Sequence, residues 1–80
     1  MKNNQKQKGY NGHRSWNSWN VSLWFNNDYN LYKQIEKSLE KDGLQKTIKQ
    51  MIFQLEGLKT PDGAIYSKIA IEDAIKGMVE

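Results

Sequence analysis

Apolar residues recur at helical spacing in four separate stretches of the chain, with polar residues between them. The third stretch is the most regular: its apolar residues lie at i, i+4, i+7, i+8 and i+11, and they are Leu44, Ile48, Met51, Ile52 and Leu55. This is the pattern of an amphipathic helix with one buried face. The pattern predicts four helices, over residues 16–26, 29–41, 44–55 and 68–79.

The residues between these stretches are those that begin and end helices. Ser15, Asp28 and Ser67 stand just before predicted helices, where a side-chain oxygen accepts a hydrogen bond from a free backbone N–H. Gly43 and Gly57 follow predicted helices, and glycine is the common residue just past a helix C-terminus. Four short helices with short connections predict an all-α fold, a compact antiparallel bundle.

The connection before the last helix has its own pattern. Residues 59–63 read Lys-Thr-Pro-Asp-Gly, in which proline presets φ and glycine allows a conformation that other residues resist. A turn is therefore expected, with a short hairpin through residues 64–66 as the alternative. Glu72 and Asp73 are expected in the first turn of the last helix, where the helix dipole favours acids.

The first predicted helix is apolar around most of its circumference. One face carries Trp16, Trp19 and Leu23, and another carries Val21, Trp24 and Phe25. A helix of this kind is either central to a core or offers a second apolar face to a partner. We expect Trp24 to lie in the core, and Trp16 and Trp19 to lie at a partner surface.

Charge is divided unevenly along the 80 residues. The first 14 hold Lys2, Lys6, Lys8 and Arg14 and no acid, whereas the rest carry eight lysines against nine acids. The first segment has a single aromatic residue and too little apolar surface to offset the entropy of ordering. The expected organisation is a flexible basic arm over residues 1–14 and a helical domain over residues 15–80.

Composition argues against catalysis and against a bound metal or cofactor. The chain has no cysteine and a single imidazole, His13, so it lacks the partners of a zinc site or of a nucleophile–base pair. It also has no glycine-rich phosphate loop. A domain of this size has little core to spare for a large cleft. We therefore expect a protein that is not an enzyme.

The chain has no apolar run of the length that crosses a bilayer. Its polar start also lacks the apolar stretch of a secretory signal. A cytoplasmic location, in a bacterial host cell, is the expectation.

One motif brings a resemblance. Residues 19–28, Trp-Asn-Val-Ser-Leu-Trp-Phe-Asn-Asn-Asp, are followed by Leu31-Tyr32, and residues 10–12 read Tyr-Asn-Gly. These parts resemble a family of small phage and plasmid proteins with no assigned enzyme activity. The resemblance covers about residues 10–32. It implies a genetic context, in which such proteins lie among genes that counter host defences, for example those of anti-CRISPR or antirestriction proteins. It carries over no functional residues.

The leading prediction is a protein that binds and inhibits a bacterial defence complex, of protein or nucleoprotein, by protein contact. The expected partner-binding residues are aromatic or basic: Trp16, Trp19, Arg14, Tyr10, Lys6 and Lys8. Aromatic and arginine side chains dominate many interfaces. One alternative is a nucleic-acid-binding accessory protein that uses Lys2, Lys6, Lys8 and Arg14. Another is a module that associates with itself, as a homodimer, through the aromatic helix.

Overall fold

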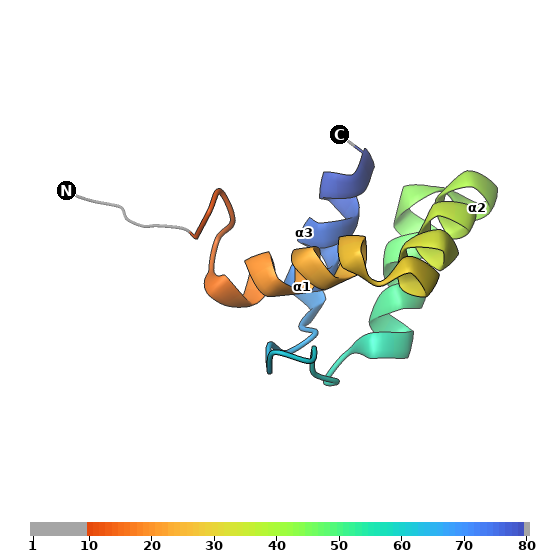
Figure 1. The fold of residues 1–80 in the computed structure, drawn as a ribbon. Coiled ribbons are helices and arrows are strands. Elements are labelled where there is room, and N and C mark those ends of the chain that lie inside the picture. The colour runs from red at the N-terminus through yellow and green to blue at the C-terminus, as the bar shows by residue number, and fades with distance from the viewer. Residues whose placement is uncertain (1–9, 80) are drawn as a thin grey trace.

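The computed structural model describes residues 10–79 and contains three helices, α1 (Trp16–Asn27), α2 (Tyr29–Leu55) and α3 (Lys68–Val79) (Figure 1). The described residues form no strand, so the all-α prediction is confirmed. The predicted count of four helices is not. The helices predicted over residues 29–41 and 44–55 form the single helix α2, which is interrupted at Gly43.

Gly43 turns α2 back on itself. Its φ of 85° and ψ of 174° lie in a region that only glycine enters readily. The segments before and after it, residues 29–42 and 44–55, lie side by side. A hydrogen bond of 2.8 Å joins the hydroxyls of Ser38 and Thr47, and the Gln34 amide donates to Gln54 Oε1 at 2.9 Å. One glycine therefore makes a helical hairpin without a separate loop.

The helix ends confirm the predicted caps. Ser15 Oγ accepts from the backbone N–H of Ser18 at 3.1 Å, and Ser67 Oγ accepts from that of Ala70 at 3.2 Å. The backbone of Asp28 is extended, which ends α1, and its Oδ1 accepts from the N–H of Leu31 at 3.2 Å, which begins α2. Local capping thus sets the helix boundaries.

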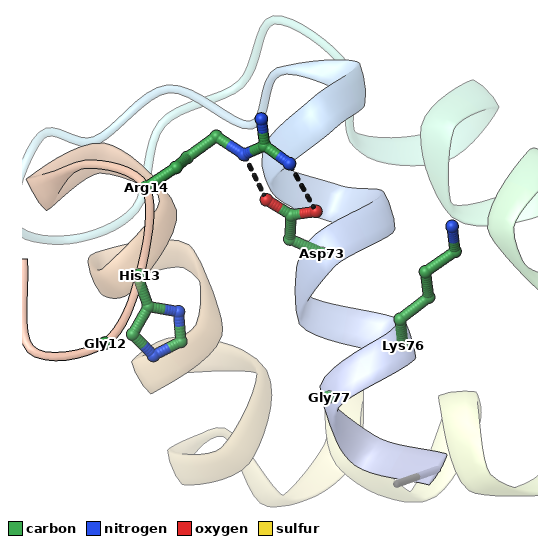
Figure 2. Close-up of a pocket in the computed structure, with 6 residues that line it drawn as sticks. All are labelled: Gly12, His13, Arg14, Asp73, Lys76 and Gly77. Carbon is green, nitrogen blue, oxygen red and sulfur yellow. Dashed lines mark hydrogen bonds and ion pairs between the residues drawn. The ribbon is translucent and has the colours of Figure 1, made fainter. Parts of the chain in front are cut away.

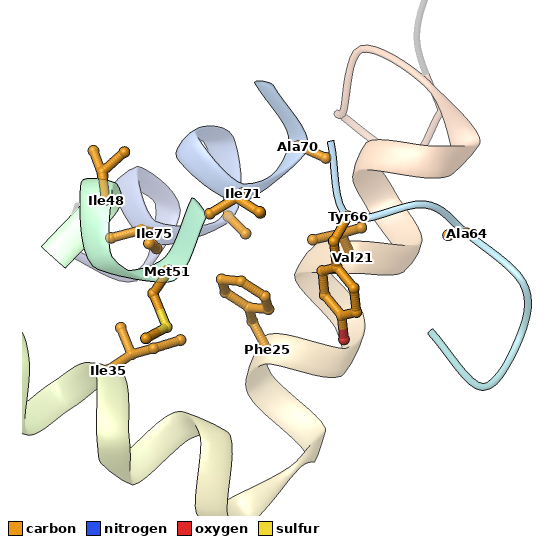
Figure 3. Close-up of a cluster of buried hydrophobic side chains, with 11 residues drawn as sticks. Val21, Phe25, Ile35, Ile48, Met51, Ala64, Tyr66, Ala70, Ile71 and Ile75 are labelled. Carbon is orange, nitrogen blue, oxygen red and sulfur yellow. The ribbon is translucent and has the colours of Figure 1, made fainter. Parts of the chain in front are cut away.

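The core lies where α1 and α3 meet the α2 hairpin, and Figure 1 shows α1 lying across α3. Its buried members come from all three helices and from the connection before α3: Val21, Phe25, Ile35, Ile48, Met51, Ala64, Tyr66, Ala70, Ile71, Ala74 and Ile75 (Figure 3). The rings of Phe25 and Tyr66 are 5.9 Å apart between centroids. Burial, with a smaller effect of the Asp28 charge, raises the pKa of the Tyr66 hydroxyl.

The expectation that Trp24 belongs to this core is wrong. Trp24 is half-buried, whereas its neighbours Val21 and Phe25 are fully buried. The apolar pattern of α1 runs around the helix, so it does not indicate which side faces inward. That side is determined by α3 and by the loop that contacts the other face.

The loop from residue 56 to residue 67 combines the two forms expected for it. The backbone of Gly63 donates to the carbonyl of Thr60 at 2.9 Å, which closes the Pro61–Asp62 turn. The Thr60 N–H then donates to the carbonyl of Ala64 at 2.8 Å, and Lys59 pairs with Ile65 in an antiparallel bridge. The loop is a short hairpin too small to form strands.

Candidate protein-binding surface

The polar residues of α1 attach the helix to the loop before α3. Thr60 Oγ1 donates to Asn20 Oδ1 at 2.6 Å, and Asn20 Nδ2 donates to Asp62 Oδ2 at 2.9 Å. Trp24 Nε1 donates to the same carboxylate oxygen, also at 2.9 Å. Asn20 is almost fully buried, so these contacts satisfy a polar group that has lost its water. The Asn and Trp of this part of the motif have a structural role.

Asp62 is the acceptor at the centre of this network. Hydrogen bonds from Asn20 and Trp24 lower the pKa of its carboxyl group, outweighing the small opposing effect of desolvation. A carboxylate that accepts such bonds is stabilised in its charged form. Asp62 is therefore ionised at neutral pH and holds the turn against α1.

Asn17 binds the same loop one turn earlier. Its side chain donates to the carbonyl of Ile65 and accepts from the N–H of Ile65, both at 2.7 Å. The Asn17 side-chain amide thus makes both hydrogen bonds to the Ile65 backbone that a residue of a neighbouring strand would make. This contact places the backbone of Ile65 beside the first turn of α1, the turn in which Trp16 also lies.

Residues 10–14 form a tight turn before α1. Tyr10 and His13 exchange two backbone hydrogen bonds of 2.6 and 2.8 Å, and Asn11 and Gly12 between them have φ of 47° and 85°. Positive φ at both central residues is the geometry of a type I′ turn. The ring of Tyr10 lies 5.1 Å from that of Trp19. The sequence assigned these residues to the flexible arm, and the structure gives them contacts with α1 and α3.

Arg14 makes the contact with α3. Its Nε and one terminal nitrogen donate to the two carboxylate oxygens of Asp73, at 2.6 and 3.2 Å (Figure 2). The hydrogen bond and the charge of Asp73 raise the pKa of the arginine. Asp73 and Glu72 were expected in the first turn of α3, but neither lies there. Asp73 binds Arg14, and Glu72 pairs with Lys76 at 2.9 Å, so both acids have partners of their own.

A pocket of about 350 Å³ opens beside this ion pair. It is lined by residues of the turn and of α3, namely Gly12, His13, Arg14, Asp73, Lys76 and Gly77 (Figure 2). Its charged side chains are engaged in ion pairs, since Arg14 binds Asp73 and Lys76 binds Glu72, which does not line the pocket. Within residues 10–79, no three His, Cys, Asp or Glu side chains come together in a way that fits a metal ion.

The structure separates the residues predicted to bind a partner. Trp16 is 41% exposed, and so is Tyr10. Trp19 is half-buried against the Tyr10 ring, and Arg14 is paired with Asp73. The predicted residues Lys2, Lys6 and Lys8 lie outside the described residues.

Two exposed isoleucines that the sequence did not single out belong to segments that bind Arg14 and Asn17, the residues on either side of Trp16. Ile65 and Ile69 are each 47% exposed. Asn17 holds Ile65 at the first turn of α1, and Ile69 lies one turn before Asp73 on the same face of α3, the face that meets Arg14. We call Tyr10, Trp16, Ile65 and Ile69 together the Trp16 surface. No local signal identifies the two isoleucines, because the contacts that place them span 48 and 59 residues.

None of the helices in the described residues is both long and apolar enough to span a membrane.

A family model for a family of unknown function (DUF7249) matches residues 6–80, so the chain belongs to this family. No curated protein and no solved structure shows a significant match to it.

Proposed function

We propose that this member of DUF7249 acts by binding a protein partner through the Trp16 surface, and that the partner is a bacterial defence complex which it inhibits. Partner binding through this surface is supported by one observation: Trp16 is exposed although the residues on either side of it are held in place. Its neighbours Ser15 and Asn17 are both engaged, one in the helix cap and the other with Ile65.

An aromatic side chain held in this way suits an interface. Tryptophan is enriched among the residues that contribute most to binding, and its cost in conformational entropy falls when the backbone beneath it is already ordered. Ile65 and Ile69 add apolar area beside Trp16, and the charged pair Arg14–Asp73 lies at the edge. An apolar centre with a polar rim is the usual composition of a protein interface.

The choice of a defence complex as the partner depends on the resemblance of residues 10–32 to small phage and plasmid proteins. It is tested by expressing the chain in a bacterium that carries a CRISPR–Cas or restriction system, together with a phage that the system blocks. Inhibition predicts that the phage forms plaques again, against one of the systems tried. Failure to restore plaques against any of them would contradict the inhibitor proposal.

Two variants separate surface binding from folding. Trp16→Ala should abolish the restored plaques while leaving the melting transition nearly unchanged. Tyr29→Ala is the matched control, because Tyr29 is an aromatic residue that is 71% exposed and lies at the start of α2, away from the Trp16 surface. If the two variants behave alike, the Trp16 surface is not the binding site.

In the alternative, the basic arm binds nucleic acid through four cationic residues. One of these, Arg14, is already paired with Asp73. Capture of the tagged chain from its host in high salt with nuclease added distinguishes the two. A protein complex that survives this treatment supports the proposal. Recovery of nucleic acid alone, lost when Lys2, Lys6 and Lys8 are changed to alanine, supports the alternative.

A further inference from the structure

The outer side of the α2 hairpin carries an exposed aromatic residue that is not part of the Trp16 surface. Phe53 is 94% exposed. Lys49 lies one turn before it and Lys46 two turns before it, and both are exposed. Residues at these spacings share one face of a helix.

Lysines of the other segment of α2 lie on the same side of the hairpin. A residue two positions from a buried residue is about 200° around the helix, and so points away from the core. Lys37 stands in this relation to the buried Ile35, and Phe53 and Lys49 stand in it to the buried Met51. Lys41 follows Lys37 by one turn and is exposed.

The two segments form one continuous surface because they are hydrogen-bonded to each other along their length. Ser38 Oγ donates to Gln50 Oε1 at 2.8 Å, in addition to its contact with Thr47, and the Gln50 amide donates to Asp42 Oδ2 at 3.3 Å. We call the residues that point away from the core here the outer face of α2. They are Lys37, Lys41, Lys46, Lys49 and Phe53.

This face is positively charged. None of its four lysines has a carboxylate within 4.0 Å among the described residues, where the ion pairs involve Arg14, Lys33 and Lys76 instead. The same side of the hairpin carries Glu40 and Glu56, which leaves the net charge positive.

We propose that the outer face of α2 binds single-stranded nucleic acid, with Phe53 stacked on a base and the lysines in contact with phosphates. An aromatic side chain among cationic ones is the combination that binds single strands with little sequence preference. A duplex hides the faces of its bases, so Phe53 has no stacking partner there. A second copy of the chain would set lysines against lysines, and one phenylalanine offers little apolar area for insertion into a membrane.

The test is fluorescence anisotropy of a fluorescein-labelled oligothymidine, titrated with the full chain at several salt concentrations, beside a duplex of the same length. The single strand is expected to bind, and more tightly than the duplex. Phe53→Ala should weaken binding about tenfold, the scale of one stacked base. Tyr29→Ala, also an exposed aromatic residue of α2, should leave the affinity unchanged.

The lysines are tested by salt dependence. Each phosphate contact to a single strand contributes about 0.7 to the slope of log affinity against log salt, so Lys46→Gln with Lys49→Gln should lower that slope by about 1.4. Lys68→Gln removes an exposed charge at the start of α3 and should leave the slope unchanged. Circular dichroism and melting of each variant confirm that it folds.

Three results would overturn the proposal. The first is no binding at low salt. The second is binding that survives Phe53→Ala unchanged, or that is lost only when Lys2, Lys6 and Lys8 are replaced. The third is a different role for Phe53. The chain would then dimerise through it, or would bind vesicles of anionic lipid and not the oligonucleotide.

Discussion

Trp24 Nε1 donates a hydrogen bond of 2.9 Å to Asp62 Oδ2, across 38 residues of sequence. Together with the bond from Asn20 to the same oxygen, it joins α1 to the turn that precedes α3. Trp24 therefore acts as a hydrogen-bond donor at the edge of the core. The Asp62 carboxylate that accepts its bond has a lowered pKa.

Stability should depend on the charge of Asp62. Because its pKa is lowered in the folded state, its contribution is fully present above the ordinary value of about 3.9 and is lost as pH falls through the folded value. Urea unfolding between pH 7 and pH 3 measures this loss. In Asp62→Asn the part of the pH dependence due to this group should disappear. An unchanged profile would contradict the assignment.

Trp24→Phe tests the donor separately. The variant keeps an aromatic ring but removes the N–H, so Asp62 loses one of the two hydrogen bonds that lower its pKa. The pKa of Asp62 should rise toward its ordinary value, and acid unfolding should begin at a higher pH. Direct NMR titration of the carboxyl group checks this, and Tyr29→Phe is a control that should not move it.

Phe25 should matter more to stability than Trp24. Phe25 is fully buried, and Phe25→Ala should lower the free energy of unfolding by about 3–5 kcal/mol through cavity formation. Trp24→Ala should cost less, because that side chain is only half-buried. Thermal or urea denaturation ranks the two variants. If Trp24→Ala proves more destabilising than Phe25→Ala, Trp24 belongs to the core and its half-buried position in the structure is wrong.

Asn20 should resist replacement although it is polar. Asn20→Ala leaves the buried Thr60 hydroxyl without its acceptor, and an unsatisfied buried group costs about 1–3 kcal/mol. Asn20→Ala with Thr60→Val removes both partners, and should lose less stability than the sum of the two single variants. Urea denaturation of the set gives the coupling energy, and additive losses would show that the bond contributes nothing.

Gly43 and Gly77 should respond to alanine in opposite directions. Gly43→Ala places a Cβ at a positive φ that alanine avoids, and should destabilise by about 1–3 kcal/mol. Gly77 lies within α3 with open space where a Cβ would be added, so Gly77→Ala should stabilise by up to about 1 kcal/mol. Melting temperatures of the two variants make the comparison.

Local sequence determined the helices and where they end. Ser15, Asp28 and Ser67 cap the helices from within three residues of their partners, and Gly43 interrupts α2 at the predicted break. Helix caps and breaks depend on backbone conformation and on residues close by in the chain, so the sequence pattern can predict them. Trp16 was expected at the surface and is 41% exposed, whereas Trp19, expected at the same surface, is half-buried.

The tertiary structure decided which side of α1 faces inward and which side chains come together. Val21 and Phe25 are fully buried, whereas Trp24 is only half-buried. Since α1 is apolar all around, its inward side depends on what packs against it. The hydrogen bonds from Thr60 to Asn20 and from Arg14 to Asp73 join residues 40 and 59 positions apart. No periodicity within one helix encodes contacts of that range, because they form only when the chain folds back on itself.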